Sequence, residues 1–362
     1  MSRWPTQRLG DLLSLEYGKA LPETFRDSAG KFVVAGSNGP QGIHSEALVK
    51  APGIVIGRKG SAGQINWYDQ DFWPIDTTYY VVPKAQINYR WLFYCLRTTR
   101  LPDLATATGV PGLNRNDVYD IRVIVPPLPE QERIVRILDE AEALRRLRAQ
   151  ADERTRSAEA ALFEQMFGSP SPDWPRDIFA NLGSLDRGRS RHRPRDEPSL
   201  FGGPYPFIQT GDVANSSGRI TTFTQTYSEL GLAQSRLWPA GTLCITIAAN
   251  IAKTGVLGFD ACFPDSVVGF NAGDRVTVEF VQAWLSTLQG RLEEEAPQAA
   301  QKNNNLKTLR ELEMAVPPIA LQQVFAARVA EVRELEAAQA ASRQRLDNLF
   351  QSLLHHAFQG EL

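Results

Sequence analysis

The segment Pro126-Pro-Leu-Pro-Glu-Gln-Glu132 stands between a short apolar segment and a long helical one, and it marks the main structural junction of the chain. Tandem prolines end a strand and favour a helix start, since proline lacks a backbone donor and its φ suits the first helical turn. The following acidic residues are favourable near the positive end of a helix dipole. A second version, Pro317-Pro-Ile-Ala-Leu-Gln322, keeps the glutamine and loses the acidic pair. The same junction therefore occurs twice.

Sequence similarity extends outward from both junctions. Near the start, Trp4-Pro5 and Gly18-Lys19 match Trp174-Pro175 and Gly188-Arg189, an offset of 170 (residue 174 against residue 4). Before the junctions, Asn114 matches Asn305, an offset of 191. The difference of 21 residues (191 against 170) indicates an insertion inside the second copy. Two copies are too few for a solenoid, so the pattern favours a duplicated pair with an internal pseudo-two-fold repeat.

Each copy ends in a long helical stretch that carries a narrow apolar stripe. The stripe comprises Ile134, Ile137, Leu144 and Leu162 in the first copy, and Phe325, Val332, Leu335, Leu346, Leu349 and Leu353 in the second. About 40 residues at 1.5 Å each give a rod of roughly 60 Å, which needs a partner to be stable. The helix of the other copy is the simplest partner, and the alternative is two unrelated helices that each lie on their own domain. We therefore expect an antiparallel coiled coil.

The chain is expected to be an α+β protein with two β-rich globular domains separated by the two long helices. β-branched and aromatic segments bounded by turn residues predict strands at 54–56, 78–82, 243–247 and 275–278, and short helices are expected at 89–97 and 280–288. The predicted division is 1–125 for the first domain, 126–168 for the first helix, 169–316 for the second domain and 317–362 for the second helix.

Composition sets limits on the function. The 362 residues carry 39 basic and 41 acidic side chains, so a globally basic nucleic-acid coat is excluded while a local basic face is not. The three cysteines form no even set and no metal-type spacing, which favours a reducing, cytoplasmic setting. No apolar run is long enough to span a membrane, and the N-terminus lacks the apolar region of a signal peptide.

Signatures of catalysis are missing from the sequence. It contains no G-x-x-x-x-G-K-[ST] phosphate loop, and the two Pro-Pro pairs lack the polar and aromatic neighbours that an amino-methyltransferase motif requires. The four histidines show neither metal-ligand nor triad spacing. We therefore expect no catalytic residues, no metal ligands and no cofactor bound by this chain.

One glycine-flanked turn carries residues suited to DNA. Arg58, Lys59 and Ser61 lie within Gly57-Arg-Lys-Gly-Ser-Ala-Gly63, directly after a predicted strand. Glycines let a backbone approach a ligand, and the two cations favour phosphate oxygens. The second copy offers Asn250 and Lys253 at the corresponding place, and asparagine suits adenine edges. The alternative is an ordinary hairpin turn with solvated charges.

Two further polar runs are candidates for DNA contact. The segment 186–195 alternates arginine with Gly, Ser and Pro, so it predicts a loop whose guanidinium groups suit phosphate or guanine. A solvated loop balanced by Asp196 and Glu197 is the alternative. The second run, 301–305, is a loop or a base-reading segment, and it matches 112–116. The candidates from these runs are Arg187, Arg189, Arg191, Arg193, Asn114, Arg115, Asn303 and Asn304.

These motifs together resemble the specificity (S) subunit of type I restriction–modification systems. The resemblance rests on Phe32-Val-Val-Ala-Gly-Ser-Asn-Gly39, Ile56-Gly-Arg-Lys-Gly-Ser-Ala-Gly63, the first Pro-Pro junction, Tyr205-Pro-Phe-Ile-Gln-Thr-Gly-Asp-Val213 and the closing Phe358-Gln-Gly-Glu-Leu362. It covers essentially the whole chain. Within these motifs Asn38, Gln209 and Thr210 become further candidates for DNA contact.

The resemblance implies a DNA-reading subunit without catalysis of its own. Each globular domain would be a target recognition domain for one half of a bipartite, asymmetric site in double-stranded DNA, and the coiled coil would set the spacer. Two methyltransferase (M) subunits and the restriction (R) subunits would be its partners and would bring S-adenosylmethionine, ATP and Mg²⁺. Two other classes stay open from the residues alone. One is a self-contained nuclease that uses Asp265 and Glu279, and the other is a coiled-coil scaffold that does not bind DNA.

Overall fold

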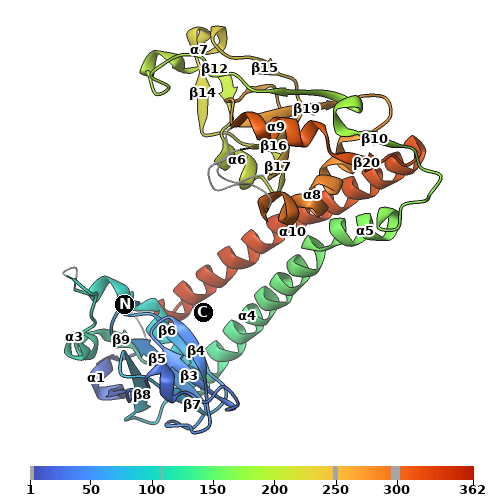
Figure 1. Ribbon diagram of the computed structural model, residues 1–362. Helices are drawn as coiled ribbons and strands as arrows, with labels where there is room; N and C mark the ends of the chain where they lie inside the picture. Colours follow the sequence, from blue (N-terminus) through green and yellow to red (C-terminus); the bar gives the residue numbers. More distant parts are fainter. Residues whose placement is uncertain (1–3, 107–108, 248–251, 295–301) are drawn as a thin grey trace. The chain divides into compact units, whose positions relative to one another are not determined.

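The computed structural model describes residues 4–106, 109–247, 252–294 and 302–362 (Figure 1). The chain forms two compact units. The first contains Met1–Gln150 and Ala340–Leu362, and the second contains Ala151–Gln339. Each unit holds one β-rich globular part and one segment of each long helix, so each is described by itself.

The globular part of the first unit contains three small sheets. The four-stranded sheet has the order β2(Leu13–Tyr17), β8(Thr78–Pro83), β5(Gly53–Gly57), β6(Ile65–Tyr68). The three-stranded sheet has the order β4(Gly39–His44), β3(Phe32–Gly36), β7(Phe72–Pro74), and β1(Thr6–Arg8) pairs with β9(Arg122–Ile124). The remaining elements are α1(Leu9–Leu12), η1(Glu23–Phe25), α2(Tyr89–Thr98), η2(Leu101–Leu104) and α3(Arg115–Asp120).

The second unit repeats this plan with additional strands. Its sheets have the orders β11(Gly183–Arg187), β19(Val267–Ala272), β16(Leu243–Thr246), β17(Thr254–Leu257), β13(Gly218–Ile220), and β14(Gln225–Tyr227), β12(Phe201–Phe207), β18(Ala261–Cys262), β15(Leu237–Trp238). β10(Arg176–Ile178) pairs with β20(Glu313–Ala315) as β1 pairs with β9. The remaining elements are η3(Phe179–Asn181), η4(Pro198–Leu200), α6(Thr210–Ala214), α7(Glu229–Ala233), α8(Val278–Glu294) and α9(Lys302–Arg310).

Equivalent residues of the two units make equivalent backbone hydrogen bonds, which confirms the predicted duplication. Where the chain leaves β2, Gly18 N–H donates to Thr78 O at 3.1 Å, and where it leaves β11, Gly188 N–H donates to Val267 O at 2.9 Å. Both glycines are required by space, because a Cβ on Gly18 would lie 2.1 Å from a carbonyl oxygen and one on Gly188 would lie 2.2 Å from another. The expected insertion lies between β12 and β16, where the first unit has only β4 between the corresponding strands.

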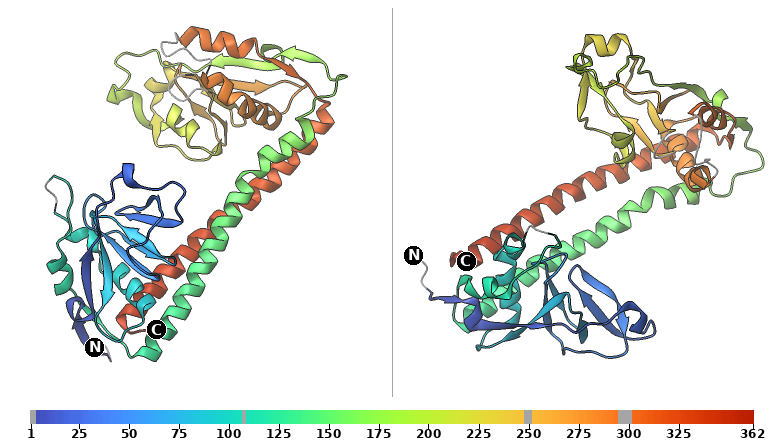
Figure 2. Two further views of the ribbon diagram at one scale, coloured as in Figure 1. Left: turned by 60° about the horizontal axis from the view of Figure 1, so that its bottom comes forward. Right: turned by 60° about the vertical axis from the view of Figure 1, so that its left-hand side comes forward.

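The long helices pack antiparallel within the first unit, where α4(Leu128–Arg156) lies beside the end of α10(Ile319–Gln359) (Figure 2). Arg145 Nε donates to Asp347 at 2.7 Å, and Arg133 reaches the carbonyl of Leu362 at 2.7 Å. Helix α2 of the globular part packs on both helices. Its buried side chains share one core with Ile134, Leu138, Phe350 and Leu354.

The same antiparallel packing occurs in the second unit, between α5(Ala158–Phe167) and the first part of α10. The rings of Phe163 and Phe167 lie 5.9 and 5.3 Å from that of Phe325, and they also contact Phe280 of α8. One buried polar pair interrupts this apolar row, because Gln339 Nε2 donates to Thr155 Oγ1 at 2.9 Å. The antiparallel helix pair predicted from the stripes is therefore present.

The structure corrects the expected stripe and the first helix. Leu144, Leu335 and Leu349 are about half exposed, and the buried row instead passes through Leu138, Val329 and Phe350. An ideal helix drifts from a strict seven-residue repeat, so a stripe drawn from sequence loses its register over many turns. Ile134 and Phe325 are fully buried, while Ile137, Leu162, Val332, Leu346 and Leu353 are partly buried.

The first long helix is also divided into two pieces. It is interrupted at Ser157, where α4 ends and α5 begins. Thr155 Oγ1 donates to Ala151 O and Ser157 Oγ donates to Arg154 O, and such side-chain bonds compete with the helical ladder.

The sequence also predicts a strand at 275–278 that the structure does not contain. Arg275 lies in a turn, Val276 and Thr277 have no regular structure, and α8 begins at Val278. Thr277 Oγ1 accepts from Phe280 N–H at 3.3 Å and so caps the helix. The strands at 54–56, 78–82 and 243–246 and the helix at 89–97 are confirmed. In the part of the chain that the structure describes, no helix is long and apolar enough to cross a bilayer.

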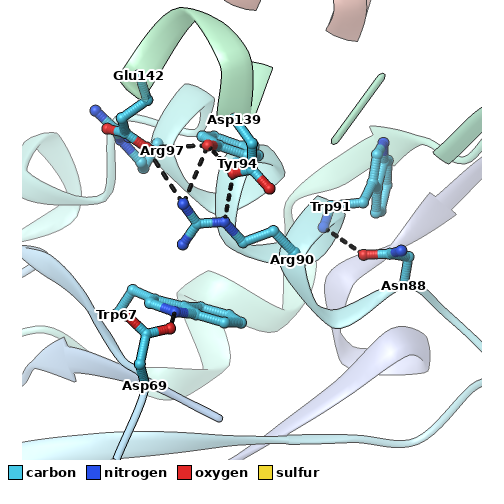
Figure 3. A network of polar contacts seen from close by, with 9 residues as sticks. All are labelled: Trp67, Asp69, Asn88, Arg90, Trp91, Tyr94, Arg97, Asp139 and Glu142. Atoms are coloured by element: carbon cyan, nitrogen blue, oxygen red, sulfur yellow. Dashed lines mark hydrogen bonds and ion pairs between the residues drawn. The ribbon is translucent and has the colours of Figure 1, made fainter. Parts of the chain in front are cut away.

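A polar network joins α2 to α4 in the first unit (Figure 3). Tyr94 Oη lies 2.6 Å from Asp139 and 2.9 Å from Glu142, and Arg90 Nε donates to Asp139 at 2.8 Å. Arg97 donates to Glu142 at 3.0 Å. Burial and the adjacent carboxylates raise the pKa of Tyr94 well above its usual value, so its hydroxyl stays protonated. The network fixes the globular part on its helix.

Candidate functional site

The turn between β5 and β6 is held by backbone bonds at its base and at its tip. Gly57 N–H donates to Gln64 O and Gly63 N–H donates to Gly57 O, both at 2.8 Å. Arg58 and Lys59 both donate their backbone N–H groups to the carbonyl of Thr77. Gly60 and Gly63 have φ of 76° and 82°, a conformation that glycine adopts without strain. The turn is therefore pre-formed, and its two cations have fixed backbone positions.

The polar segment 112–116 of the first domain lies against this turn. Leu113 N–H donates to Arg58 O at 2.9 Å, and Asn114 caps α3 by accepting from Asn116 N–H at 3.0 Å. The guanidinium groups of Arg58 and Arg115 each lie 5.3 Å from the ring of Tyr17. Arg58 also donates to Asp76 O at 2.7 Å, and Lys59 is exposed. We call the three cations Arg58, Lys59 and Arg115, together with the adjoining Asn114, the first cation cluster.

Asn38 and Ser61 lie beside the first cation cluster. Asn38 is exposed in the turn between β3 and β4, and the preceding residue, Ser37, donates its hydroxyl to the same Thr77 carbonyl that receives Arg58 and Lys59. Ser61 is half-buried, and its carbonyl accepts from Gln64 N–H within the turn. Every candidate of the first domain is thus gathered at one end of its four-stranded sheet.

The described residues at the base of the corresponding turn in the second unit make the same backbone bonds and carry different side chains. Thr246 N–H donates to Lys253 O at 2.9 Å and Ala252 N–H donates to Thr246 O at 2.8 Å, as in the first copy. Buried Ile247 donates to Ser266 O at the place where Arg58 donates to Thr77 O. Lys253 is half-buried, and Asn250 lies outside the described residues.

The arginine-rich segment supplies the cations of the second unit. Arg187 ends β11 at the register position of Tyr17, and burial lowers the pKa of its guanidinium. Arg189, Arg191 and Arg193 lie exposed on the loop that follows. The Gln234 side-chain oxygen accepts from the backbone N–H groups of residues 191 and 192 at 2.6 and 3.0 Å, which holds the loop in place.

Gln209 and Thr210 join this loop at one cavity. The cavity has a volume of about 420 Å³, and Ser190, Arg195 and the rings of Phe207 and Tyr227 also line it. Arg195 is held at its edge by Asp265, whose carboxylate accepts two bonds at 3.0 and 3.2 Å. We call Arg189, Arg191, Arg193, Gln209 and Thr210 the second polar cluster.

Sequence reasoning missed Gln225, which also lines the cavity and accepts from Gln209 Nε2 at 2.6 Å. It lies 16 residues away on β14, and no local motif marks it.

Asn303 and Asn304 lie on helix α9, where the sequence analysis had allowed a loop. The backbone from Lys302 to Arg310 is helical, and the side chains of these two asparagines lie outside the described residues. The corresponding first-copy segment is helical only from Arg115.

The geometry of the described side chains bears on metal-type clusters, reactive cysteines and the carboxylate pair. Across residues 4–106, 109–247, 252–294 and 302–362, no three His, Cys, Asp or Glu side chains gather to hold a metal ion. Cys95 and Cys244 are fully buried, which raises their pKa and disfavours the reactive thiolate. Asp265, considered above as half of a carboxylate pair, is ion-paired with Arg195 at 3.0 Å.

The duplicated β-rich domain and the antiparallel helices define a class of two-domain proteins with an internal repeat. The chain belongs to the family described as type I restriction modification DNA specificity domain, whose model matches residues 1–153 and again 182–342. The two matches agree with the internal repeat.

Individual relatives cover nearly the full chain. The type I restriction enzyme EcoDI specificity subunit of Escherichia coli is 23% identical over 99% of this chain and 88% of its own length. The type I S subunit of M. genitalium superposes with a TM-score of 0.64 at 15% identity, covering 99% of this chain and 96% of that one. A chain from a study of assembly and conformational transition of the type I restriction–modification system gives 0.62 at 18% identity, covering 99% and 98%. These structures share the fold.

Proposed function

We propose that this chain is the sequence-reading subunit of a type I restriction–modification complex. Each globular domain reads one half of a bipartite, asymmetric site in double-stranded DNA. The first domain does so with Asn38, Ser61 and the first cation cluster. The second does so with the second polar cluster, together with Arg187, Asn250, Lys253, Asn303 and Asn304.

One observation carries the proposal. The two domains share their backbone at the point where the chain leaves β2 and β11, yet the side chains around that point differ. The first domain places Tyr17, Arg58 and Arg115 there, and the second places Arg187 and the arginine-rich loop. A shared scaffold with different polar side chains at one place suits two domains that dock similarly and read different bases.

The helix pair is proposed to bind two M subunits and to set the spacer between the two half-sites. Half-exposed leucines support this role, because Leu144, Leu147 and Leu349 in the first unit and Leu335 in the second leave apolar area in solvent. Exposed apolar side chains that gather along a helix mark protein-binding surfaces. In this proposal the R subunits join that core.

The chemistry is assigned to the partners. We propose that S-adenosylmethionine is bound by the M subunits and that ATP and Mg²⁺ are used by the R subunits, while this chain binds none of them. It selects the site, and the partner subunits act on the DNA that it positions.

Methylome sequencing of a host that carries this chain with its M subunit tests the proposal. We expect a split motif with one methylated adenine in each half. A continuous motif, or no motif that depends on this chain, would overturn the bipartite assignment. Removing seven residues from α4 is expected to change the spacer length and to leave both halves unchanged.

A further inference from the structure

The second domain carries two exposed glutamines that are joined by a hydrogen bond. Gln209 Nε2 donates to Gln225 Oε1 at 2.6 Å. Gln209 precedes α6, where its backbone N–H donates to Asp212 at 2.8 Å, and Gln225 begins β14 opposite Phe207 of β12. Two different elements therefore fix the backbone of the pair.

The bond between the amides sets what each one can offer to a ligand. It uses an N–H of Gln209 and the carbonyl of Gln225, so the Gln225 NH₂ group takes no part in it. The Gln209 carbonyl caps α6 by accepting from the backbone N–H of Asp212, and its second lone pair takes part in neither bond. The pair therefore retains one acceptor position and one donor group. Both side chains are exposed, so this edge is open to a macromolecule.

The surroundings favour an anionic macromolecule with a polar edge. Both amides line the cavity of about 420 Å³ together with Thr210, Ser190, Asp196 and Arg195, and Arg195 is ion-paired with Asp265. Ser190 lies in the arginine-rich loop between exposed Arg189 and Arg191, whose charges suit phosphate oxygens. A duplex that contacts this loop would bring base edges close to the amide pair.

We propose that Gln209 and Gln225 together read one adenine in the major groove of the second half-site. Adenine presents the N6 amino donor and the N7 acceptor, which complement the Gln209 carbonyl and the Gln225 NH₂ group. Guanine presents two acceptors, so its O6 would oppose the Gln209 carbonyl. This inference rests on the proposed DNA-reading function and assigns a base to two residues of the same site.

The test measures base preference at every position of the half-site. The full chain in complex with its methyltransferase partner is incubated with duplexes randomised in the second half-site, and bound sequences are counted. For Gln225→Ala we expect adenine preference to fall about 5- to 150-fold at one position, with the other positions unchanged. Gln225→Glu replaces the donor with an acceptor and is expected to shift that position toward cytosine, whose N4 amino group is a donor.

Matched variants separate the outcomes. Gln323→Ala, on the exposed side of α10, is expected to leave every position unchanged. If wild type selects a bipartite site and the Gln225 variants select the same bases with the same preference, the inference is wrong while the proposed function stands. If wild type selects no sequence, the proposed function itself fails. Equal melting temperatures for wild type and Gln225→Ala exclude unfolding as the cause of a lost preference.

Discussion

Gln131 and Gln322 occupy equivalent places in the two copies and make equivalent hydrogen bonds. Gln131 accepts from Asn88 N–H and donates to Pro126 O, both at 2.8 Å. Gln322 accepts from Thr277 N–H at 3.0 Å and donates to Pro317 O at 2.8 Å. Both side chains are essentially inaccessible to solvent. Each glutamine therefore joins the start of a long helix to the start of the domain helix, α2 or α8.

The first prediction concerns this glutamine. Gln131→Ala is expected to lower the free energy of unfolding by roughly 2–4 kcal/mol, because a backbone donor and a carbonyl lose their partner in a buried place. Gln322→Ala is expected to cost a similar amount. Urea denaturation measures both, and exposed Glu132→Ala is the control, expected to change stability by less than about 0.5 kcal/mol. A larger loss for Glu132→Ala than for Gln131→Ala would show that the acidic pair, absent from the second copy, fixes this junction.

The second prediction concerns phosphate contact by the first cation cluster. Lys59→Ala is expected to weaken DNA binding by the complex and to reduce the slope of log K against log salt concentration by about 1. Arg58→Ala is expected to do the same. Lys84→Ala is the matched control, because Lys84 follows the far end of β8, about 20 Å along the strand from the Thr77 carbonyl that holds the turn. Equal slopes for wild type and Lys59→Ala would rule out this phosphate contact.

The third prediction concerns the exposed leucines of α4. Leu144→Ser with Leu147→Ser is expected to change stability by less than about 1 kcal/mol in total, because these side chains are 52% and 61% exposed. The proposed binding of an M subunit is expected to weaken, since the variant removes apolar contact area. Analytical ultracentrifugation with the partner measures assembly. Unchanged assembly would place the partner elsewhere on the chain.

The fourth prediction concerns pH and Glu159, which lies 3.5 Å from Arg333. Burial, and then the nearby Glu336 and Glu279, raise the pKa of this carboxyl despite the arginine. Its folded pKa is above its unfolded pKa, so its contribution to stability is present below the unfolded pKa and is lost as pH rises through the folded one. In the Glu159→Gln variant the side chain at position 159 is uncharged throughout the range from pH 4 to pH 8. The stability of the variant relative to wild type is therefore expected to rise between pH 4 and pH 8.

Urea midpoints for both proteins at intervals across that range measure the difference. A stability difference that falls with rising pH would mean that the pairing with Arg333 outweighs burial. Arg333 keeps a second partner in the variant, since it donates to Gln282 Oε1 at 2.9 Å.

Much of the fold was predictable because its signals are local. The Pro-Pro junctions, the strands at 54–56 and 78–82 and the glycine turn at 57–63 each depend on neighbouring residues. The register of the helix pair was not predictable from the sequence. A small angular drift per helical turn places Phe350 in the core and leaves Leu349 half exposed.

The candidate site shows the same limit. The turn residues Arg58 and Lys59 were found from their glycine neighbours, and the structure adds Tyr17 as the ring that Arg58 and Arg115 share. The sequence did not indicate Gln225, because its contact with Gln209, 16 residues away, depends on the pairing of β14 with β12. The sequence did not show the role of the buried glutamine of each junction, because the backbone N–H groups that it accepts from lie 43 and 45 residues away.

In the proposed function, each domain reads its own half of the site independently. Replacing residues 1–125 with the first domain of another family member, and then selecting bound sequences from randomised duplexes with the complete complex, tests it most directly. We predict that one half of the selected motif changes while the other half and the spacer stay as in wild type. A change in both halves, or in neither, would show that the two domains do not read separate halves.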